Sequence, residues 1–222
     1  MAKNYIETIP QHYIAIEGVI GVGKTALATK LARYIDARLI LEEVEENPFL
    51  ANFYQDMRSY ALATQLFFLL SRKRQQEQIA QIDLFTQRVV SDYLFEKDRI
   101  FAYLTLSDAE IKLYEKIYQF LAKDLPRPDL VIYLQAPVDI LLVRIKKRGR
   151  NFEQEIDRKY LELLTDAYNH FFLHYSEAPL LIVDCATIDF VKNNLEFFDL
   201  FHAIASTTSG KKYYSPKPKE KK

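Results

Sequence analysis

The eight residues from Gly18 to Thr25, GVIGVGKT, constrain the fold more than any other stretch of the chain. They match the pattern G-x-x-x-x-G-K-[ST], follow a short apolar run at 12–17 and open a segment with helical periodicity at 24–36. In such a unit the glycines let backbone N–H groups point at phosphate oxygens, and the helix N-terminus adds positive potential. The stretch therefore predicts a site for a nucleoside triphosphate with Mg²⁺, in which Lys24 reaches the β- and γ-phosphates and the Thr25 hydroxyl faces the metal ion. The predicted binding residues of this phosphate loop are Gly18, Val19, Ile20, Gly21, Val22, Gly23, Lys24 and Thr25.

Short apolar runs alternate with helical segments along the rest of the chain. The runs expected to form strands are 12–17, 38–42, 88–91, PRPDLVIYLQAP and PLLIVDC. The segments expected to form helices are 24–36, 60–81, 107–121, 138–147, 157–175 and 189–204. This alternation predicts an α/β fold of three layers, with a five-stranded parallel sheet that carries helices on both faces. We expect one domain over residues 1–204 and a flexible basic tail over 205–222.

Composition narrows the class of protein further. The chain has 222 residues, 49% of them hydrophobic, which suits one domain with a substantial core. The formal net charge is zero, so we expect binding to neither nucleic acid nor membrane, and no apolar run approaches the roughly 20 residues that span a bilayer. A single cysteine, Cys185, allows no internal disulfide and no zinc cluster, and it favours a reducing, cytoplasmic location.

The phosphate loop does not identify the acceptor of the phosphoryl group. Water as acceptor would make the protein a GTPase or ATPase switch, but the N-K-x-D motif typical of GTPases is absent from the sequence. A kinase for a small acceptor needs a positioned carboxylate and a mobile, arginine-rich lid that excludes water. The segment RIKKRGRNFEQE supplies Arg144, Arg148 and Arg150, whose guanidinium groups suit the charge of a transferring phosphoryl group. We therefore expect a lid near residues 144–155.

Three separated stretches resemble the deoxyribonucleoside kinases, in the branch that phosphorylates deoxyadenosine, deoxyguanosine or deoxycytidine. LEEVEENPFLANFYQD resembles the family segment in which a strand-end glutamate precedes an N-P-[FY]-L helix start. ATQLFFLLSR resembles the helix with a glutamine and, seven residues later, an arginine, and RGRNFEQE resembles the lid. The resemblance covers residues 13–172 approximately. It implies a P-loop kinase with ATP as donor, Mg²⁺ as cofactor, a deoxynucleoside as substrate and a homodimer packed through helices.

The resemblance implies a role for each matching residue in the substrate site. Glu42 matches the general base that takes the proton of the sugar 5′-hydroxyl. Tyr54 and Glu153 match contacts to the 3′-hydroxyl. Gln65 matches the residue that pairs with the edge of the base, and Arg72 matches an arginine near the base and the 5′ end. The residue spacing agrees, because Gln65 and Arg72 lie two helical turns apart and share one helix face with Phe68.

The resemblance also implies which residues act on the phosphates. Arg148 and Arg150 match catalytic lid arginines, with Arg144 one helical turn before them, and Lys24 is the lysine of the phosphate loop. Glu42 lies at the carboxyl end of the second expected strand, where ligands bind in sheets of this kind. The glutamates that follow it, Glu43, Glu45 and Glu46, are expected to be mostly solvated.

The third expected strand departs from the family pattern. Asp92 can occupy the acidic position that follows this strand, where it would contact the substrate site and hold Mg²⁺ directly or through water. The next residue is Tyr93, where familiar members have arginine. Lys97 or a lid arginine replaces the missing positive charge, or the transition state is stabilised differently. Asp98 resembles a residue that helps to read the base, although a one-residue gap is needed to align it.

Two other functions stay open from the sequence. The chain could act on a nucleoside monophosphate, as a thymidylate kinase does, or it could be a nucleotide-dependent switch without a small acceptor. The preferred base is also open, because the Gln65 amide both donates and accepts hydrogen bonds and suits adenine, guanine or cytosine. Phe101 and Phe120 are expected in the core.

Overall fold

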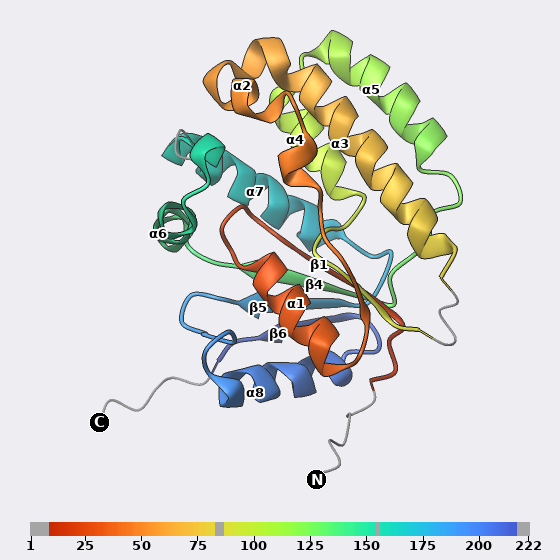
Figure 1. Cartoon of the computed structure of the whole chain (residues 1–222), viewed down its shortest axis with the longest axis vertical. Helices are drawn as coiled ribbons and strands as arrows, with labels where there is room; N and C mark the ends of the chain where they lie inside the picture. Colours follow the sequence, from red (N-terminus) through yellow and green to blue (C-terminus); the bar gives the residue numbers. More distant parts are fainter. Residues whose placement is uncertain (1–8, 83–86, 154–155, 217–222) are drawn as a thin grey trace.

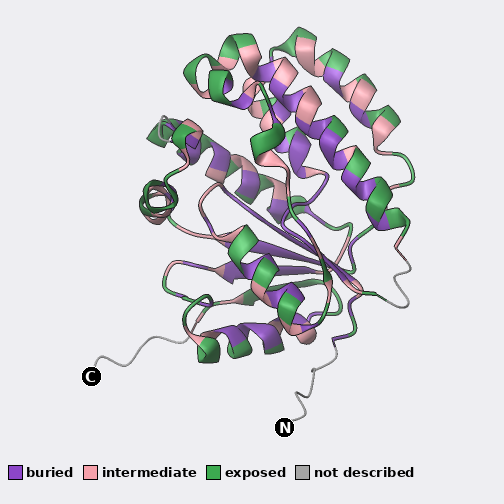
Figure 2. Ribbon diagram, in the orientation of Figure 1, coloured by how far each residue is buried: buried purple, intermediate pink, exposed green. Residues whose placement is uncertain are grey.

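A six-stranded parallel sheet forms the centre of the molecule (Figure 1). The protein is described by a computed structural model that covers residues 9–82, 87–153 and 156–216. The strands are arranged in the order β2-β3-β1-β4-β5-β6. Their bounds are β1 Tyr13–Gly18, β2 Arg38–Ile40, β3 Val89–Ser91, β4 Leu130–Gln135, β5 Leu180–Asp184 and β6 Lys211–Tyr214. Almost every residue of β1, β3, β4 and β5 is buried, because helices cover both faces of the sheet (Figure 2).

The sixth strand corrects the prediction of five strands and of a flexible tail from residue 205. β6 pairs in parallel with β5, in a register that joins Leu180 to Lys211 and Val183 to Tyr214. Its sequence, KKYY, lacks an apolar pattern, but an edge strand tolerates charged and exposed side chains because only one side of its backbone is paired. Residues 217–222 of the predicted tail lie outside the described residues.

Eight α-helices are described; six of them lie in the predicted helical segments, and α2 follows the helix start expected at Asn47-Pro48. Their bounds are α1 Lys24–Tyr34, α2 Leu50–Gln55, α3 Met57–Ala80, α4 Lys97–Thr105, α5 Asp108–Leu121, α6 Val138–Arg148, α7 Arg158–His174 and α8 Asn194–Ala205. The sequence analysis did not predict α4. Local side chains set several starts: Ser107 and Glu110 form a capping box at α5, and the Asn193 side chain accepts from the backbone of Leu195 and so starts α8 five residues later than expected.

The helices divide into two groups around the sheet. Helices α1 and α8 lie together on one side, where the Tyr34 ring meets Phe197 and Phe201 edge to face (Figure 1). Helix α7 lies on the other side and packs against α4, which in turn packs against α3 and α5. Because β1 has β3 on one side and β4 on the other, the chain crosses over in opposite directions from this strand, and such a switch point is where ligands bind in open α/β sheets.

Candidate active site

A cavity of about 1780 Å³ opens at the carboxyl ends of the strands. Its wall contains the segments that follow β1, β2, β3 and β5, together with the inner faces of α3, α4 and α6. Most of the predicted site residues line it: Ile20, Gly21, Val22, Gly23, Lys24, Thr25, Glu42, Tyr54, Gln65, Arg72, Asp92, Arg144, Arg148, Arg150 and Glu153. Gly18, Val19 and Asp98 are not in its lining.

The phosphate loop is held in shape from its own backbone and from α6. The Lys24 ammonium donates to the carbonyl oxygen of Gly18 at 2.7 Å and so closes the loop. Arg144 donates to the carbonyl oxygens of Val22 and Cys185, both at 2.9 Å, and thereby ties the loop to the end of β5. Arg144 was predicted to contact the nucleotide. It lines the cavity, and its hydrogen bond to Val22 also holds the loop in place.

The residues predicted to hold Mg²⁺ lie against each other. The Thr25 hydroxyl donates to Asp92 Oδ2 at 2.5 Å, and Asp92 Oδ1 accepts from the backbone N–H of Glu42 at 2.7 Å. Burial raises the pKa of Asp92. Both side chains present oxygen atoms beside the phosphate loop, and oxygen is the ligand that Mg²⁺ prefers, so the donor set fits this ion.

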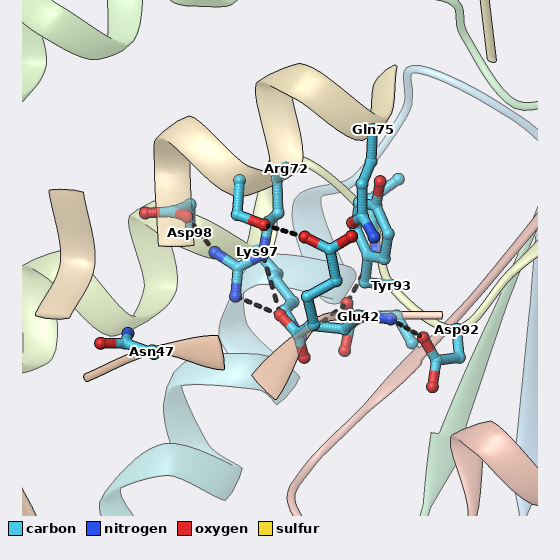
Figure 3. Close-up of polar contacts among 12 residues, drawn as sticks. Glu42, Asn47, Arg72, Gln75, Asp92, Tyr93, Lys97 and Asp98 are labelled. Carbon is cyan, nitrogen blue, oxygen red and sulfur yellow. Dashed lines mark hydrogen bonds and ion pairs between the residues drawn. The ribbon is translucent and has the colours of Figure 1, made fainter. Parts of the chain in front are cut away.

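Glu42 lies between two cations at the end of β2 (Figure 3). Its Oε1 accepts from Nε of Arg72 at 2.9 Å, and its Oε2 accepts from Nζ of Lys97 at 2.8 Å. Burial opposes ionisation of this carboxyl group, but the positive charges of Lys97 and Arg72 outweigh it, and the pKa of Glu42 is lowered. Glu42 is therefore an ionised carboxylate that can accept a proton.

Asp98 lies behind Arg72 and outside the cavity. Its side chain is fully buried, and its two oxygens accept from the Arg72 guanidinium and from the Tyr114 hydroxyl, the latter at 2.9 Å. Burial raises the pKa of Asp98. The geometry supports an action through Arg72, and the predicted contact between Asp98 and the substrate stays a prediction.

The face of α3 that was predicted to contact the base of the substrate lines the cavity. Gln65, Phe68 and Arg72 line it together, and the Arg72 guanidinium lies 4.9 Å from the centre of the Phe68 ring. Gln65 is 2% exposed and makes one long hydrogen bond, 3.4 Å, to the Thr105 hydroxyl. Its amide is therefore weakly engaged and available to a ligand. Phe101, expected in the core, packs against the core and also lines the cavity.

The segment predicted to form a lid contributes residues to another part of the cavity wall. Arg148 donates to Glu153 at 2.9 Å, and Glu153 is 4% exposed although it follows a charged helix end. Arg150 lies 3.5 Å from Glu153 and 3.3 Å from Glu45. The Tyr54 ring stacks nearly parallel to Phe152, with ring centres 6.4 Å apart. Gln154 and Glu155 of the predicted lid lie outside the described residues.

This arrangement of phosphate loop, base-reading helix face and lid has known counterparts. Residues 14–209 match the family described as deoxynucleoside kinase. The chain belongs to the deoxynucleoside kinase family. This kinase is an enzyme that transfers a phosphoryl group from a nucleotide to a deoxynucleoside.

Several relatives of the kinase carry specific names. It is 42% identical over 190 residues to deoxyguanosine kinase from Bacillus subtilis, and the aligned region covers 83% of this chain and 92% of the relative. It is 36% identical over 164 residues to deoxyadenosine kinase from Dictyostelium discoideum, which covers 72% of this chain and 66% of the relative. The solved structure of deoxyadenosine kinase from M. mycoides with bound dATP superposes with a TM-score of 0.77 at 25% identity, over 88% of this chain and all of that one.

Two buried hydroxyl groups in the cavity wall of the kinase were not anticipated. Thr64 and Tyr160 are 1% and 7% exposed, and neither hydroxyl has a hydrogen-bond partner among the described residues. Buried polar groups are rarely left unpaired, so we expect a polar atom of a ligand to form a hydrogen bond with each of these hydroxyl groups. Thr64 could have been found from its position next to Gln65; the sequence around Tyr160 carries no signal beyond helical periodicity.

A buried carboxylate before the phosphate loop was also missed. Glu17 is fully buried, and it accepts from the backbone N–H groups of Gly18 at 2.8 Å and Leu94 at 2.9 Å and from the Tyr168 hydroxyl at 3.1 Å. It links β1 to the segment after β3. A glutamate at the last position of an otherwise apolar strand was the available signal.

The acidic segment after Glu42 is less solvated than predicted. Glu43 accepts from the Ser71 hydroxyl at 2.8 Å and from Arg74 at 2.5 Å, and Glu45 pairs with Arg150. Glu46 lies 3.6 Å from Arg74 with its side chain 61% exposed. The prediction of mostly solvated side chains therefore fits Glu45 and Glu46, whose side chains are 70% and 61% exposed, but not Glu43, at 29%. Phe120, expected in the core, is 72% exposed.

No helix in the described ranges is both long and apolar enough to cross a membrane.

Proposed function

We propose that the kinase transfers the γ-phosphoryl group of ATP to the 5′-hydroxyl of deoxyguanosine, deoxyadenosine or deoxycytidine, and so supplies the 5′-monophosphate for nucleotide salvage. The observation that supports this proposal most directly is the ionised Glu42 carboxylate in the cavity wall, between the face of α3 proposed to read the base and the phosphate loop. A nucleoside that meets Gln65 with its base would extend its sugar toward Glu42.

Glu42 acts in this proposal as general base. Its carboxylate takes the proton of the 5′-hydroxyl while the oxygen attacks the γ-phosphorus and the bond to the leaving ADP oxygen breaks. Arg72 fixes the carboxylate through Oε1, so that it points along the cavity rather than rotating. Tyr54 and Glu153 are proposed to hold the 3′-hydroxyl, and Arg148 and Arg150 to neutralise the charge of the phosphates.

Thr25 and Asp92 are the residues that would hold Mg²⁺. The ion would balance the negative charge of the triphosphate when it is bound with the nucleotide. Lys24 would contribute its ammonium group to the same phosphates. Burial, and to a smaller extent the positive charge of Lys97, lower the pKa of Lys24, which is the shift expected of a lysine in a site built for an anion.

Deoxyguanosine is our first candidate among the three substrates. The relative that is 42% identical to this chain is a deoxyguanosine kinase, while relatives named as deoxyadenosine kinases are 36% and 31% identical. The weakly engaged Gln65 amide offers a donor and an acceptor to a purine edge. Kinetics with the four deoxynucleosides and their monophosphates test this: turnover on monophosphates alone would exclude the proposal.

The experiment that tests Glu42 directly is the substitution Glu42→Gln. It keeps the size of the side chain and a hydrogen-bond acceptor but removes the proton acceptor, so kcat should fall by about 10²–10⁴-fold while the KM for the deoxynucleoside changes little. Glu46→Gln is the matched control, because Glu46 is an exposed member of the same acidic segment. Equal losses in both variants, or normal turnover of Glu42→Gln, would contradict the role of Glu42.

We also propose that the kinase is a cytoplasmic homodimer. Helices α3 and α5 lie side by side and expose Leu70, Leu113 and Phe120 at 55%, 49% and 72% (Figure 1). Exposed apolar side chains on neighbouring helices favour association. The buried free thiol of Cys185 suits a reducing compartment. Light scattering should give twice the chain mass for the wild type and a lower mass for Leu113→Lys.

A further inference from the structure

Lys97 is a buried lysine with spare hydrogen-bonding capacity. Its side chain is 3% exposed, although lysine is almost never buried unless it is paired. Within the described part of the chain its ammonium makes one hydrogen bond, to Oε2 of Glu42 at 2.8 Å, while Oε2 of Glu17 lies 3.9 Å away, too far for a hydrogen bond. An ammonium group has three donors. Donors of Lys97 are therefore available to a ligand in the cavity that it lines.

A second ammonium group in the same cavity, that of Lys24, favours an anion as that ligand. In one chain of contacts the carboxylates of Glu17, Glu42 and Asp98 alternate with the cations Lys97 and Arg72, and Glu17 also accepts three other hydrogen bonds. Lys24 lies close enough to Lys97 that the positive charge of Lys97 contributes to lowering the pKa of Lys24. Two ammonium groups that line one cavity repel each other until an anion binds near both.

Among the described residues, neither the position after Asp92 nor the lid offers an unpaired cation at the end of β3. Tyr93, the residue after Asp92, is fully buried, and its hydroxyl lies 3.5 Å from Nε2 of Gln76, away from the cavity lining (Figure 3). The lid arginines have carboxylate partners of their own, since Arg148 pairs with Glu153 and Arg150 with Glu45 and Glu153.

We propose that Lys97 is a catalytic residue that binds the transferring phosphoryl group and remains with it on the monophosphate product. The inference rests on the proposed function of Glu42. In the step, the 5′-oxygen forms a bond to the γ-phosphorus, the bond to the ADP oxygen breaks, and the hydroxyl proton passes to Glu42. The neutral carboxyl group then attracts Lys97 less, so the ammonium is released toward the phosphoryl oxygens at the moment when they reach the acceptor.

Equilibrium binding separates a phosphate contact from a structural role. We would compare Glu42→Gln with Glu42→Gln/Lys97→Met, in which Lys97 and the carboxylate to which it donates a hydrogen bond are both neutral. Glu17 keeps its three other hydrogen bonds in that background. Calorimetry would measure the affinity for deoxyguanosine and for its 5′-monophosphate without ATP.

The added Lys97→Met substitution should weaken binding of the monophosphate by about 10- to 100-fold and leave binding of the deoxynucleoside nearly unchanged, because a hydrogen bond to a charged group is lost from the phosphate alone. Equal affinities for the monophosphate in the two variants would overturn the proposal. Parallel losses for both ligands would overturn it as well, since they would indicate damage to the pocket.

Turnover supplies an independent readout in the otherwise intact enzyme. Lys97→Met should lower kcat far more than it raises either KM, Lys97→Arg should restore part of the rate because it keeps the charge, and Lys116→Met on the exposed face of α5 should match the wild type. Unchanged kcat in Lys97→Met would contradict the role. If the wild type phosphorylates deoxynucleosides and Lys97→Met does so equally well, only this inference is refuted. If the wild type does not phosphorylate deoxynucleosides, the proposed function itself is refuted.

Discussion

At the scale of single residues, the base-reading face of α3 combines one strongly held side chain with one weakly held side chain. Arg72 is fixed between Glu42 and Asp98, both of them buried carboxylates. Gln65, two turns away, makes the long contact to Thr105 and no other side-chain hydrogen bond within the described residues. In the proposed function the fixed guanidinium group orients Glu42 as general base, and the loosely held amide can reorient its donor and acceptor toward an incoming base.

Replacement of Gln65 should therefore act on the nucleoside and not on the donor. We expect Gln65→Ala to raise the KM for the deoxynucleoside, because a buried polar edge of the substrate loses its partner. The increase should correspond to a loss of about 1–3 kcal/mol in binding free energy. The KM for ATP should stay close to that of the wild type. Steady-state kinetics with each substrate varied in turn provides the measurement, with the exposed Gln119→Ala as control. A change confined to the KM for ATP would show that the base lies elsewhere in the cavity.

At the scale of elements, the phosphate loop depends on α6 as much as on its own glycines. Gly21 has a φ of +85°, and a Cβ atom at this position would lie 2.7 Å from Cγ1 of Ile145 and 3.0 Å from the carbonyl oxygen of Leu141. The loop thus runs against the helix that also carries Arg144 and leads into the lid.

Gly21→Ala should both destabilise the fold and weaken binding of ATP. The left-handed backbone alone costs a non-glycine residue about 1–2 kcal/mol, and the close contact with α6 adds to this cost. Gly210→Ala is the matched control, because Gly210 also has a positive φ of +63° but has nothing within 4 Å of its added Cβ atom. Urea unfolding and calorimetric titration with ATP would compare the two variants. If both lost the same free energy of unfolding, packing against α6 would not matter.

At the scale of the whole molecule, β6 completes the sheet beyond the expected domain boundary. It covers the edge of β5, and the Lys211 ammonium donates to the carbonyl oxygen of Phe172 at 3.1 Å, near the end of α7. The segment thereby joins two layers of the fold. Its removal would leave the backbone of Leu180–Asp184 unpaired on one side.

A chain that ends at Ser209 should be less stable than one that ends at Pro216. The shorter chain loses the ladder between β5 and β6, and at about 0.5–1.5 kcal/mol for each hydrogen bond we expect a loss of about 2–4 kcal/mol in the free energy of unfolding. Urea denaturation of the two proteins would measure the difference, and the longer one retains every element that the structure describes. Identical denaturation midpoints would mean that β6 adds nothing to stability.

The sequence by itself determined the features that depend on neighbouring residues. The pattern from Gly18 to Thr25 specified the strand–loop–helix unit, and the seven-residue spacing of Gln65 and Arg72 placed both side chains on one face of α3, because helical periodicity is a local property. The apolar runs likewise predicted five of the six strands, since strands covered on both faces require such side chains.

Only the tertiary structure decided which distant groups meet. Glu42 and Lys97 are 55 positions apart, and their contact depends on how α4, which the sequence analysis did not predict, packs beside the end of β2. Glu45 meets Arg150 across the cavity for a similar reason. β6 escaped prediction because KKYY has no apolar alternation, and its pairing is provided by the free edge of β5. Charge contacts and edge pairing depend on the approach of whole elements, which no local pattern encodes.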